Sequence, residues 1–183
     1  MTNTHDLAGT VPDFRAGIWE VDLAHSEITF SIRQLVGNVH GRVTGFDLTI
    51  TTGDDPLASS VRATVELASV STGHRRRDTH IRSATFLDVA NHPRVTYHST
   101  GIRRAGDGWA IDGELTLHGV TRAVPLTVAA AGFAADPEGG RHASFSASAL
   151  VDRSDFGIDR WTRGGIVGTK VAINLEIRAV LVA

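Results

Sequence analysis

The segment from Ser71 to Asp88, STGHRRRDTHIRSATFLD, holds the densest group of chemically active side chains in the sequence. Three consecutive arginines lie in this stretch, with histidines on either side of them and aspartates after them. Side chains of these types could bind phosphate, hold a metal ion or act as a histidine and carboxylate pair in catalysis. The remaining sequence has to decide between these chemistries and a plain connection between strands.

Each of these chemistries lacks a necessary part. A nucleic-acid surface needs a longer basic run with stacking aromatic residues, and the chain has a net charge of -2. A metal site could be drawn from His74, Asp78 and His80, with His92 and His98 further along the chain, but these residues lack the spacing of histidine metal motifs. Catalysis by Asp78 and His80 lacks a serine in a nucleophile turn. We therefore expect no nucleic-acid partner, no metal and no cofactor, and we keep an enzyme using Asp78 and His80 as an alternative.

The length and composition favour one domain. The chain has 183 residues, of which 42% are hydrophobic, and this suits a single core. It contains no cysteine, which excludes disulfides and sulfur-ligated metals. The sequence has no apolar run of membrane-spanning length, and residues 1–16 do not resemble a secretory signal. We expect a cytoplasmic protein with a flexible N-terminal extension over 1–16 and one domain over 17–183.

Apolar and polar residues alternate along most of the chain with the period of strands that bury one face. The last segment is clearest, because Ile173 and Leu175 alternate with Asn174 and Glu176. The pattern predicts about eight long strands and a short one at 18–21. The long strands are expected at 27–35, 40–50, 60–70, 94–103, 109–119, 122–132, 142–151 and 170–183. Long strands joined by turn-forming residues indicate an all-β antiparallel barrel or sandwich, and we favour the barrel.

The segment with the arginines interrupts this alternation. Its spacing predicts a short connecting helix near 75–83, in which Asp78 precedes Arg82 by one helical turn and can pair with it. The arginines are interpreted mainly as a solvated face of this helix.

The apolar faces of the strands predict which side chains point into the barrel. Small residues such as Ala63, Gly113 and Ala149 on these faces favour an interior that side chains leave open, although Phe30 and Phe145 could fill it. The alternation does not decide between an open and a filled interior. The expected interior positions, and the candidate ligand contacts, are Phe30, Ile32, Val65, Leu67, Tyr97, Ile111, Leu115, Phe145, Ala147, Ile173 and Leu175.

Motifs over roughly residues 18–180 resemble those of a known family. They are WEVDLAHSEITFSIR with His25 and Ser26, ASVSTGHRRRDTHIRSATFLD with Arg77, Asp78, His80 and Phe86, GELTLHGVTRAVPL, and DRSDFG with Arg153, Phe156 and Gly157. In this order and spacing they resemble the YceI-like family of polyisoprenoid-binding proteins. Gln34, Leu87 and Lys170 depart from the family pattern.

This resemblance implies a lipocalin-like barrel that acts as a binding or carrier protein rather than an enzyme. Its apolar interior would hold a long isoprenoid, quinone-like or fatty-acid-like chain, and the motif residues named above would be structural. The sequence leaves a homodimer open. A structural interaction protein with a filled barrel is the other alternative.

The charge of the ligand head group is a further expectation. A diphosphate at the mouth of an apolar tunnel needs a cation, and the expected interior positions include no Lys or Arg. We therefore favour a neutral or quinone-like head group, with Gln34 near a strand end as one side chain that could meet it.

Overall fold

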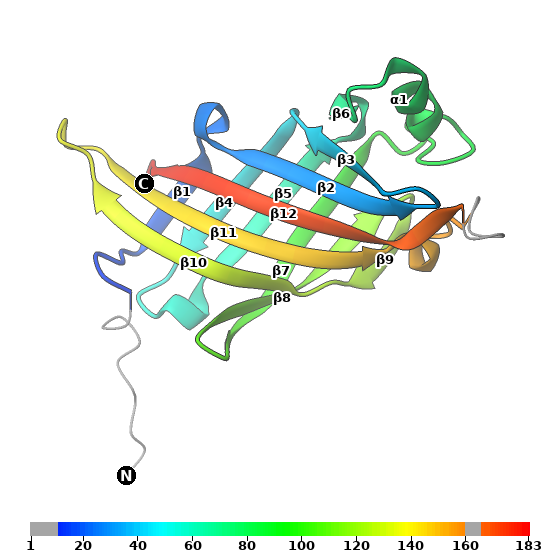
Figure 1. The fold of residues 1–183 in the computed structure, drawn as a ribbon. Coiled ribbons are helices and arrows are strands. Elements are labelled where there is room, and N and C mark those ends of the chain that lie inside the picture. Colours follow the sequence, from blue (N-terminus) through cyan, green and yellow to red (C-terminus); the bar gives the residue numbers. More distant parts are fainter. Residues whose placement is uncertain (1–10, 160–165) are drawn as a thin grey trace, which may run out of the picture.

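Antiparallel strands make up most of this computed structural model, which describes residues 11–159 and 166–183 (Figure 1). The strands are β1 (Gly17–Val21), β2 (Glu27–Gln34), β3 (Asn38–Val43), β4 (Phe46–Thr52), β5 (Ser60–Glu66), β6 (Val70–Ser71), β7 (Arg94–Ala105), β8 (Gly108–Leu117), β9 (Val120–Ala123), β10 (Leu126–Ala135), β11 (Arg141–Asp152) and β12 (Val167–Leu181). One α-helix, α1 (Arg75–Arg82), and short 3-10 helices η2 (Leu23–His25), η3 (Pro56–Ala58), η4 (Leu67–Ser69) and η5 (Arg153–Phe156) complete the described part.

Eight of these strands close into a ring, which confirms the predicted barrel. Their order is β1-β4-β5-β7-β8-β10-β11-β12, and β1 pairs with β12 to complete the circle. In this closing pair Trp19 lies opposite Leu181 and Val21 lies opposite Ala179. The earlier part of β12 pairs instead with β2, which continues the sheet through β3 to β6. One long strand thus holds both the ring and its extension.

Three of the predicted strands are interrupted where the backbone cannot continue. Residues 40–50 form β3 and β4, because the chain turns at Gly45, whose amide donates to the Ser69 hydroxyl at 2.9 Å. Residues 122–132 divide at Pro125, which has no amide hydrogen to give to a ladder. Residues 60–70 divide at η4 between β5 and β6. The expectation of unbroken strands was therefore wrong at these positions.

The end of the barrel where β1 begins is filled by aromatic side chains. Phe133 makes edge-to-face contacts with Phe14, Trp19 and Phe145, at ring-centroid distances of 5.2, 5.2 and 5.8 Å. Trp19 is fully buried, and its indole nitrogen donates to the Thr52 hydroxyl at 2.8 Å. Phe14 belongs to the segment expected to be an extension, of which residues 1–10 lie outside the described part. Aromatic side chains thus take up most of the interior at this end of the barrel.

Helix α1 forms where the sequence predicts it, between β6 and β7 and at the opposite end of the barrel (Figure 1). His74 caps its first turn, and the Arg82 guanidinium donates to the Val70 carbonyl at 2.5 Å. Asp78 is only 8% exposed and accepts hydrogen bonds from the Thr72 amide at 2.8 Å, the Thr72 hydroxyl at 2.6 Å and the Ser71 hydroxyl at 3.3 Å. The helix is therefore tied to the strand before it mainly through Asp78, and the Arg82 side chain bonds the backbone.

These bonds favour the charged carboxylate. The hydrogen bond from the Thr72 hydroxyl, with smaller contributions from the Thr72 amide, Ser71 and the charge of Arg82, lowers the pKa of Asp78 despite its burial.

In the described residues, no helix is long and apolar enough to cross a membrane.

The first prediction concerns this anchor. Asp78→Ala should lower the free energy of unfolding by about 1 to 3 kcal/mol, because three donors lose their buried acceptor. Urea denaturation followed by circular dichroism measures the change, and Arg76→Ala on the exposed face of the same helix is the matched control. Because the folded pKa is lowered, the difference should be complete above about pH 4 and should shrink as the pH falls further. An Asp78→Ala protein as stable as the Arg76→Ala control at neutral pH would contradict this role.

Candidate ligand-binding cavity

The interior of the barrel is hollow toward the α1 end. A cavity of about 520 Å³ lies there, within the range of known small-molecule sites. A second cavity of about 120 Å³ lies beside the aromatic cluster. Leu48, Val61, Leu126 and Leu175 line both, so they form the constriction between the two spaces. The interior is thus filled at one end and hollow at the other.

All eleven interior positions expected from the alternation line these cavities. The large cavity is lined by Phe30, Ile32, Val65, Leu67, Tyr97, Leu115, Ile173 and Leu175, and the small one by Ile111, Phe145, Ala147 and Leu175. Small side chains account for much of the open space, because Ala63 and Ala149 face the large cavity where longer residues would fill it. The Phe30 ring lines the cavity and lies over Gly41, where an added Cβ would be 2.3 Å from the ring.

A few polar side chains in the lining of the large cavity come from the elements around α1. They are Gln34, Arg77, His80 and Arg153, together with Tyr97 of β7. Gln34 ends β2, Arg77 and His80 belong to α1, and Arg153 begins η5. The cavity therefore joins a long apolar wall to a polar end.

Arginines in this lining correct an assumption made from the sequence. None of the interior positions expected from the alternation is Lys or Arg, and Arg77 and Arg153 were expected to be structural motif residues, but both also reach the cavity. Arg75 and Arg76 are exposed as expected. The alternation missed Arg153 because it follows the end of β11, where the period of two no longer applies.

Both arginines donate hydrogen bonds to the protein itself. Arg77 Nε donates to the Thr72 hydroxyl at 2.8 Å, and its Nη2 donates to the Thr72 carbonyl at 3.2 Å. Arg153 is 2% exposed and donates to the carbonyls of Ile158 at 2.6 Å, Gly168 at 2.9 Å and Val167 at 3.3 Å. Its guanidinium also lies 5.2 Å from the Phe86 ring centre, and burial lowers its pKa. Arg153 thereby connects η5, the start of β12 and the segment after α1.

The other family-motif residues lie in different places. His25 contacts the Asp22 carboxylate at 2.7 Å, and Ser26 exchanges hydrogen bonds with the Arg178 backbone, both outside the cavity lining. Phe156 is buried in a second core cluster, and Gly157 ends η5 at φ 74°. A structural role for each of them stays a prediction.

His74, Asp78 and His80, the first residues considered for a metal site, each have separate neighbours. His74 Nδ1 accepts the Arg77 amide, Asp78 faces Thr72, and His80 lies near Phe86 at 6.4 Å between ring centres. The fold instead brings together Asp88, His92 and His118, a group that shares only His92 with the residues considered from the sequence. The distance of His118 from the other two in sequence hid this group.

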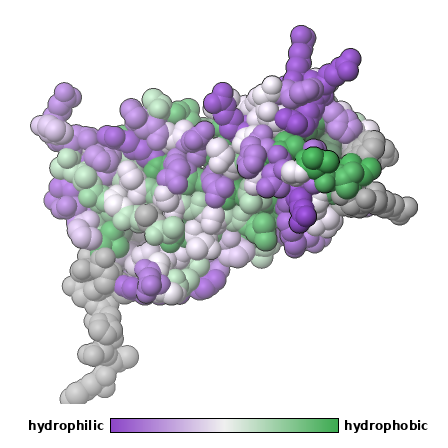
Figure 2. All heavy atoms as spheres, in the orientation of Figure 1, coloured by the Kyte–Doolittle hydropathy of each residue, from purple (hydrophilic) through white to green (hydrophobic). Residues whose placement is uncertain are grey.

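The surface beside the large cavity carries exposed apolar residues. Leu35 and Val36, in the turn between β2 and β3, are 75% and 90% exposed, and Ile166 is 46% exposed. Gln34 and Ile166 also line the cavity, which places this apolar surface next to it. Figure 2 shows a hydrophobic area at the α1 end of the barrel, below the hydrophilic residues at the top of that end.

The chain belongs to the YceI-like domain family, whose model matches residues 19–179. It is 39% identical over 136 residues to Protein YceI of Escherichia coli O17:K52:H18 (strain UMN026 / ExPEC), covering 73% of this chain and 71% of that protein. It is 40% identical over 136 residues to Protein YceI of Salmonella newport (strain SL254), with the same coverage.

Solved structures share the fold. BcnA of Burkholderia cenocepacia matches with a TM-score of 0.76 at 22% identity, covering 86% of this chain and 98% of that one. The YCEI protein of Campylobacter jejuni matches with a TM-score of 0.71 at 21% identity, covering 100% and 99%. A polyisoprenoid binding domain from Saccharophagus degradans matches with a TM-score of 0.63 at 15% identity, covering 92% and 100%. These likenesses confirm the predicted lipocalin-like fold.

Tyr97 gives the second prediction, because it is the one tyrosine of the sequence and faces the cavity. Its hydroxyl lies 3.1 Å from the Val124 carbonyl and 3.2 Å from the Ile111 carbonyl. Burial, with the charge of Asp112, raises the pKa of Tyr97 to about 12. The folded protein should therefore form phenolate near pH 12, and the urea-unfolded chain near about pH 10.

Ultraviolet titration measures both transitions, and Tyr97→Phe supplies the background without tyrosine. Since the folded state holds the proton more tightly, the free energy of unfolding should fall as the pH rises from about 10 toward 12. A folded protein with an ordinary phenol titration would show that the ring is hydrated.

Proposed function

We propose that this YceI-like protein binds one long apolar chain, an isoprenoid or a similar amphiphilic lipid, inside the barrel and acts as its carrier. The observation that carries this proposal is the cavity of about 520 Å³ with its apolar wall. Each methylene group moved from water into such a space contributes about 0.8 kcal/mol. A chain of many such groups needs few polar contacts to be held.

The likeness to the polyisoprenoid binding domain from Saccharophagus degradans supports this class of ligand. An eight-stranded barrel is also the size at which the interior either fills with side chains or holds one small ligand. The large cavity favours the second outcome over the filled barrel.

The arrangement of polar residues supports one orientation for the ligand. The aromatic cluster around Phe133 blocks the far end, so the tail would point toward it. Gln34 and His80 at the α1 end would lie beside the head group. The exposed Leu35 and Val36 next to this end offer an apolar path from a membrane or another carrier.

The alternative of catalysis by Asp78 and His80 has little geometric support. Asp78 accepts its hydrogen bonds from Ser71 and Thr72, so its carboxylate is committed to holding α1. We therefore propose binding rather than turnover as the function.

The third prediction tests the cavity with variants on one strand. Ala149→Trp places an indole in the large cavity and should weaken binding of a long prenyl alcohol at least about tenfold, because displacing two methylene groups already removes about 1.6 kcal/mol. Ala147→Trp fills the small cavity and should affect long chains more than short ones. Leu150→Trp, at an outward position 62% exposed, is the matched control.

Binding is measured by fluorescence titration and by mass spectrometry of lipid extracted from each purified protein. Equal binding by folded Ala149→Trp and Leu150→Trp proteins would place the ligand outside the barrel.

The fourth prediction concerns the head group, for which we propose a neutral or quinone-like chemistry. Arg77 and Arg153 reach the cavity, but they donate to Thr72 and to backbone carbonyls, which occupies donors that a diphosphate would need. A prenyl alcohol or quinone should bind at least as well as the matching prenyl diphosphate at moderate salt.

Titrations at low and moderate salt compare the ligands, and replacing the exposed Arg75 and Arg76 by Gln removes attraction by the outer surface. A diphosphate that binds more than about tenfold tighter, in both the parent and this variant, would establish an anionic ligand held by the inner arginines.

A further inference from the structure

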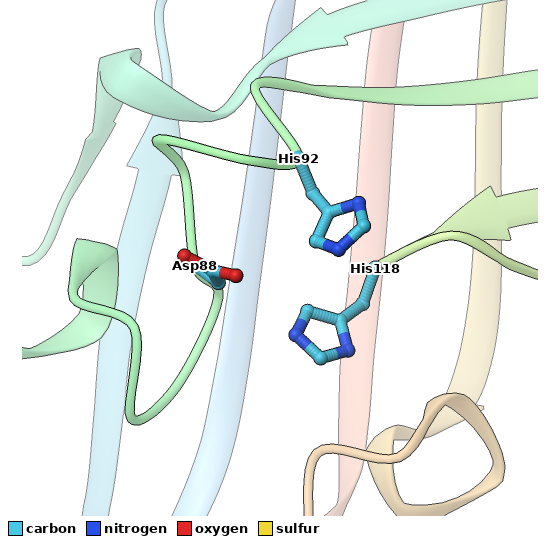
Figure 3. Close-up of side chains that lie close together, drawn as sticks. All are labelled: Asp88, His92 and His118. Atoms are coloured by element: carbon cyan, nitrogen blue, oxygen red, sulfur yellow. The ribbon is translucent and has the colours of Figure 1, made fainter.

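Three potential metal ligands from two separate elements meet near the α1 end of the barrel. Asp88 and His92 lie on the segment between α1 and β7, and His118 lies on the turn between β8 and β9. One ligand atom from each can be chosen so that all three lie within 4.8 Å of one another, and all three side chains are half-buried. Figure 3 shows the Asp88 carboxylate on one side and the two imidazole rings facing it.

The neighbours of these side chains orient them for binding a cation. His118 Nδ1 lies 3.3 Å from the Phe156 carbonyl, which favours a proton on Nδ1 and leaves Nε2 with its lone pair. Histidines that bind metals are usually fixed by such a bond from the second ring nitrogen to a carbonyl or carboxylate. The Asn91 amide donates to both Asp88 oxygens, at 2.9 and 3.1 Å, and so holds the carboxylate in place. Both ligands therefore have the outer support typical of metal sites.

Two of the three ligand residues have backbone conformations that residues other than glycine rarely adopt. Asp88 has φ 49° and His118 has φ 54°. His118 and Gly119, at φ 74°, form the two-residue turn of the β8 and β9 hairpin, where Asn-Gly would be the ordinary choice. The lack of a side chain at Gly119 leaves room for the His92 ring, since a Cβ there would be 3.1 Å from it. The two rings lie 4.7 Å apart between centres.

We infer that Asp88, His92 and His118 form a binding site for a divalent transition metal ion such as zinc. Two imidazoles and one carboxylate are a ligand set that zinc accepts in proteins, with a fourth position left for water. Tetrahedral zinc with bonds of about 2.0 to 2.1 Å needs its ligands about 3.4 Å apart. The three ligand atoms now lie within 4.8 Å of one another, so binding would require them to approach by up to about 1.4 Å.

A bound ion would join two parts of the cavity wall. Leu87 and Leu117, the chain neighbours of Asp88 and His118, both line the large cavity. The metal would therefore clamp the segment after α1 to the β8 and β9 hairpin at the end where the lipid is proposed to enter. The metal site is inferred from its own ligands and does not depend on lipid binding.

The test is titration of the chelator-treated full chain with zinc chloride by calorimetry. We expect one equivalent to bind at this site, and Asp88→Asn, His92→Gln and His118→Asn each to weaken that binding at least about tenfold. His118→Asn keeps a residue that suits the left-handed turn, so it should remain folded. His98→Gln is the matched control, because His98 pairs with Glu114 on the outer surface at 3.0 Å without belonging to the group of three.

Cobalt(II) provides a second readout. The parent protein should give the intense visible absorption of a tetrahedral cobalt site, and His118→Asn should lose it while His98→Gln keeps it. No stoichiometric zinc binding, or zinc binding that the three site variants leave unchanged, would overturn the inference. Loss of zinc binding in His98→Gln but not in His118→Asn would assign the ion to the outer surface and would overturn it equally.

Discussion

The pairing of β1 with β12 is the constraint on which the remaining structure depends. It satisfies the backbone hydrogen bonds of strands that would otherwise be sheet edges, so the ring has no open edge of its own. With the backbone satisfied in the wall, the interior can be lined mainly by apolar side chains. The same long strand then pairs with β2 and extends the wall past the ring. Closure and cavity are thus two results of one arrangement.

The distribution of side-chain size along the barrel gives the cavity its direction. Trp19, Phe133 and Phe145 fill one end, and their edge-to-face contacts leave only a small space beside them. Ala63 and Ala149 line the other end and leave a large one. In the binding mode that we propose, the apolar tail points toward the closed end and the head group lies beside the polar groups around α1. The proposed direction of binding follows from packing more than from charge.

Much of the fold and of the cavity wall was predictable from the sequence. The period of two identified all eleven interior positions, because a strand in a barrel must place alternate side chains inside whatever its partners are. Helix α1 was predictable from the break in that period. The interruptions at Gly45 and Pro125 were missed, since a strand that bends and re-pairs keeps the same alternation as a continuous one. Local pattern thus determined which residues face the interior.

The tertiary structure alone decided whether that interior is open and which distant residues meet there. How much of the barrel Phe30 and Phe145 fill depends on the residues next to them. Phe30 lies over Gly41, and Phe145 packs against Phe133. Strand pairing brings these neighbours together, so the sequence pattern does not show them. Arg153 reaches the cavity because η5 packs against the segment after α1, where its guanidinium lies over the Phe86 ring. His118 lies near Asp88 because the turn between β8 and β9 packs beside the segment between α1 and β7. Neither connecting segment follows the alternation of the strands. The sequence by itself determined the wall, because that property is local, whereas the space and the side-chain clusters depend on the pairing of strands far apart in the chain.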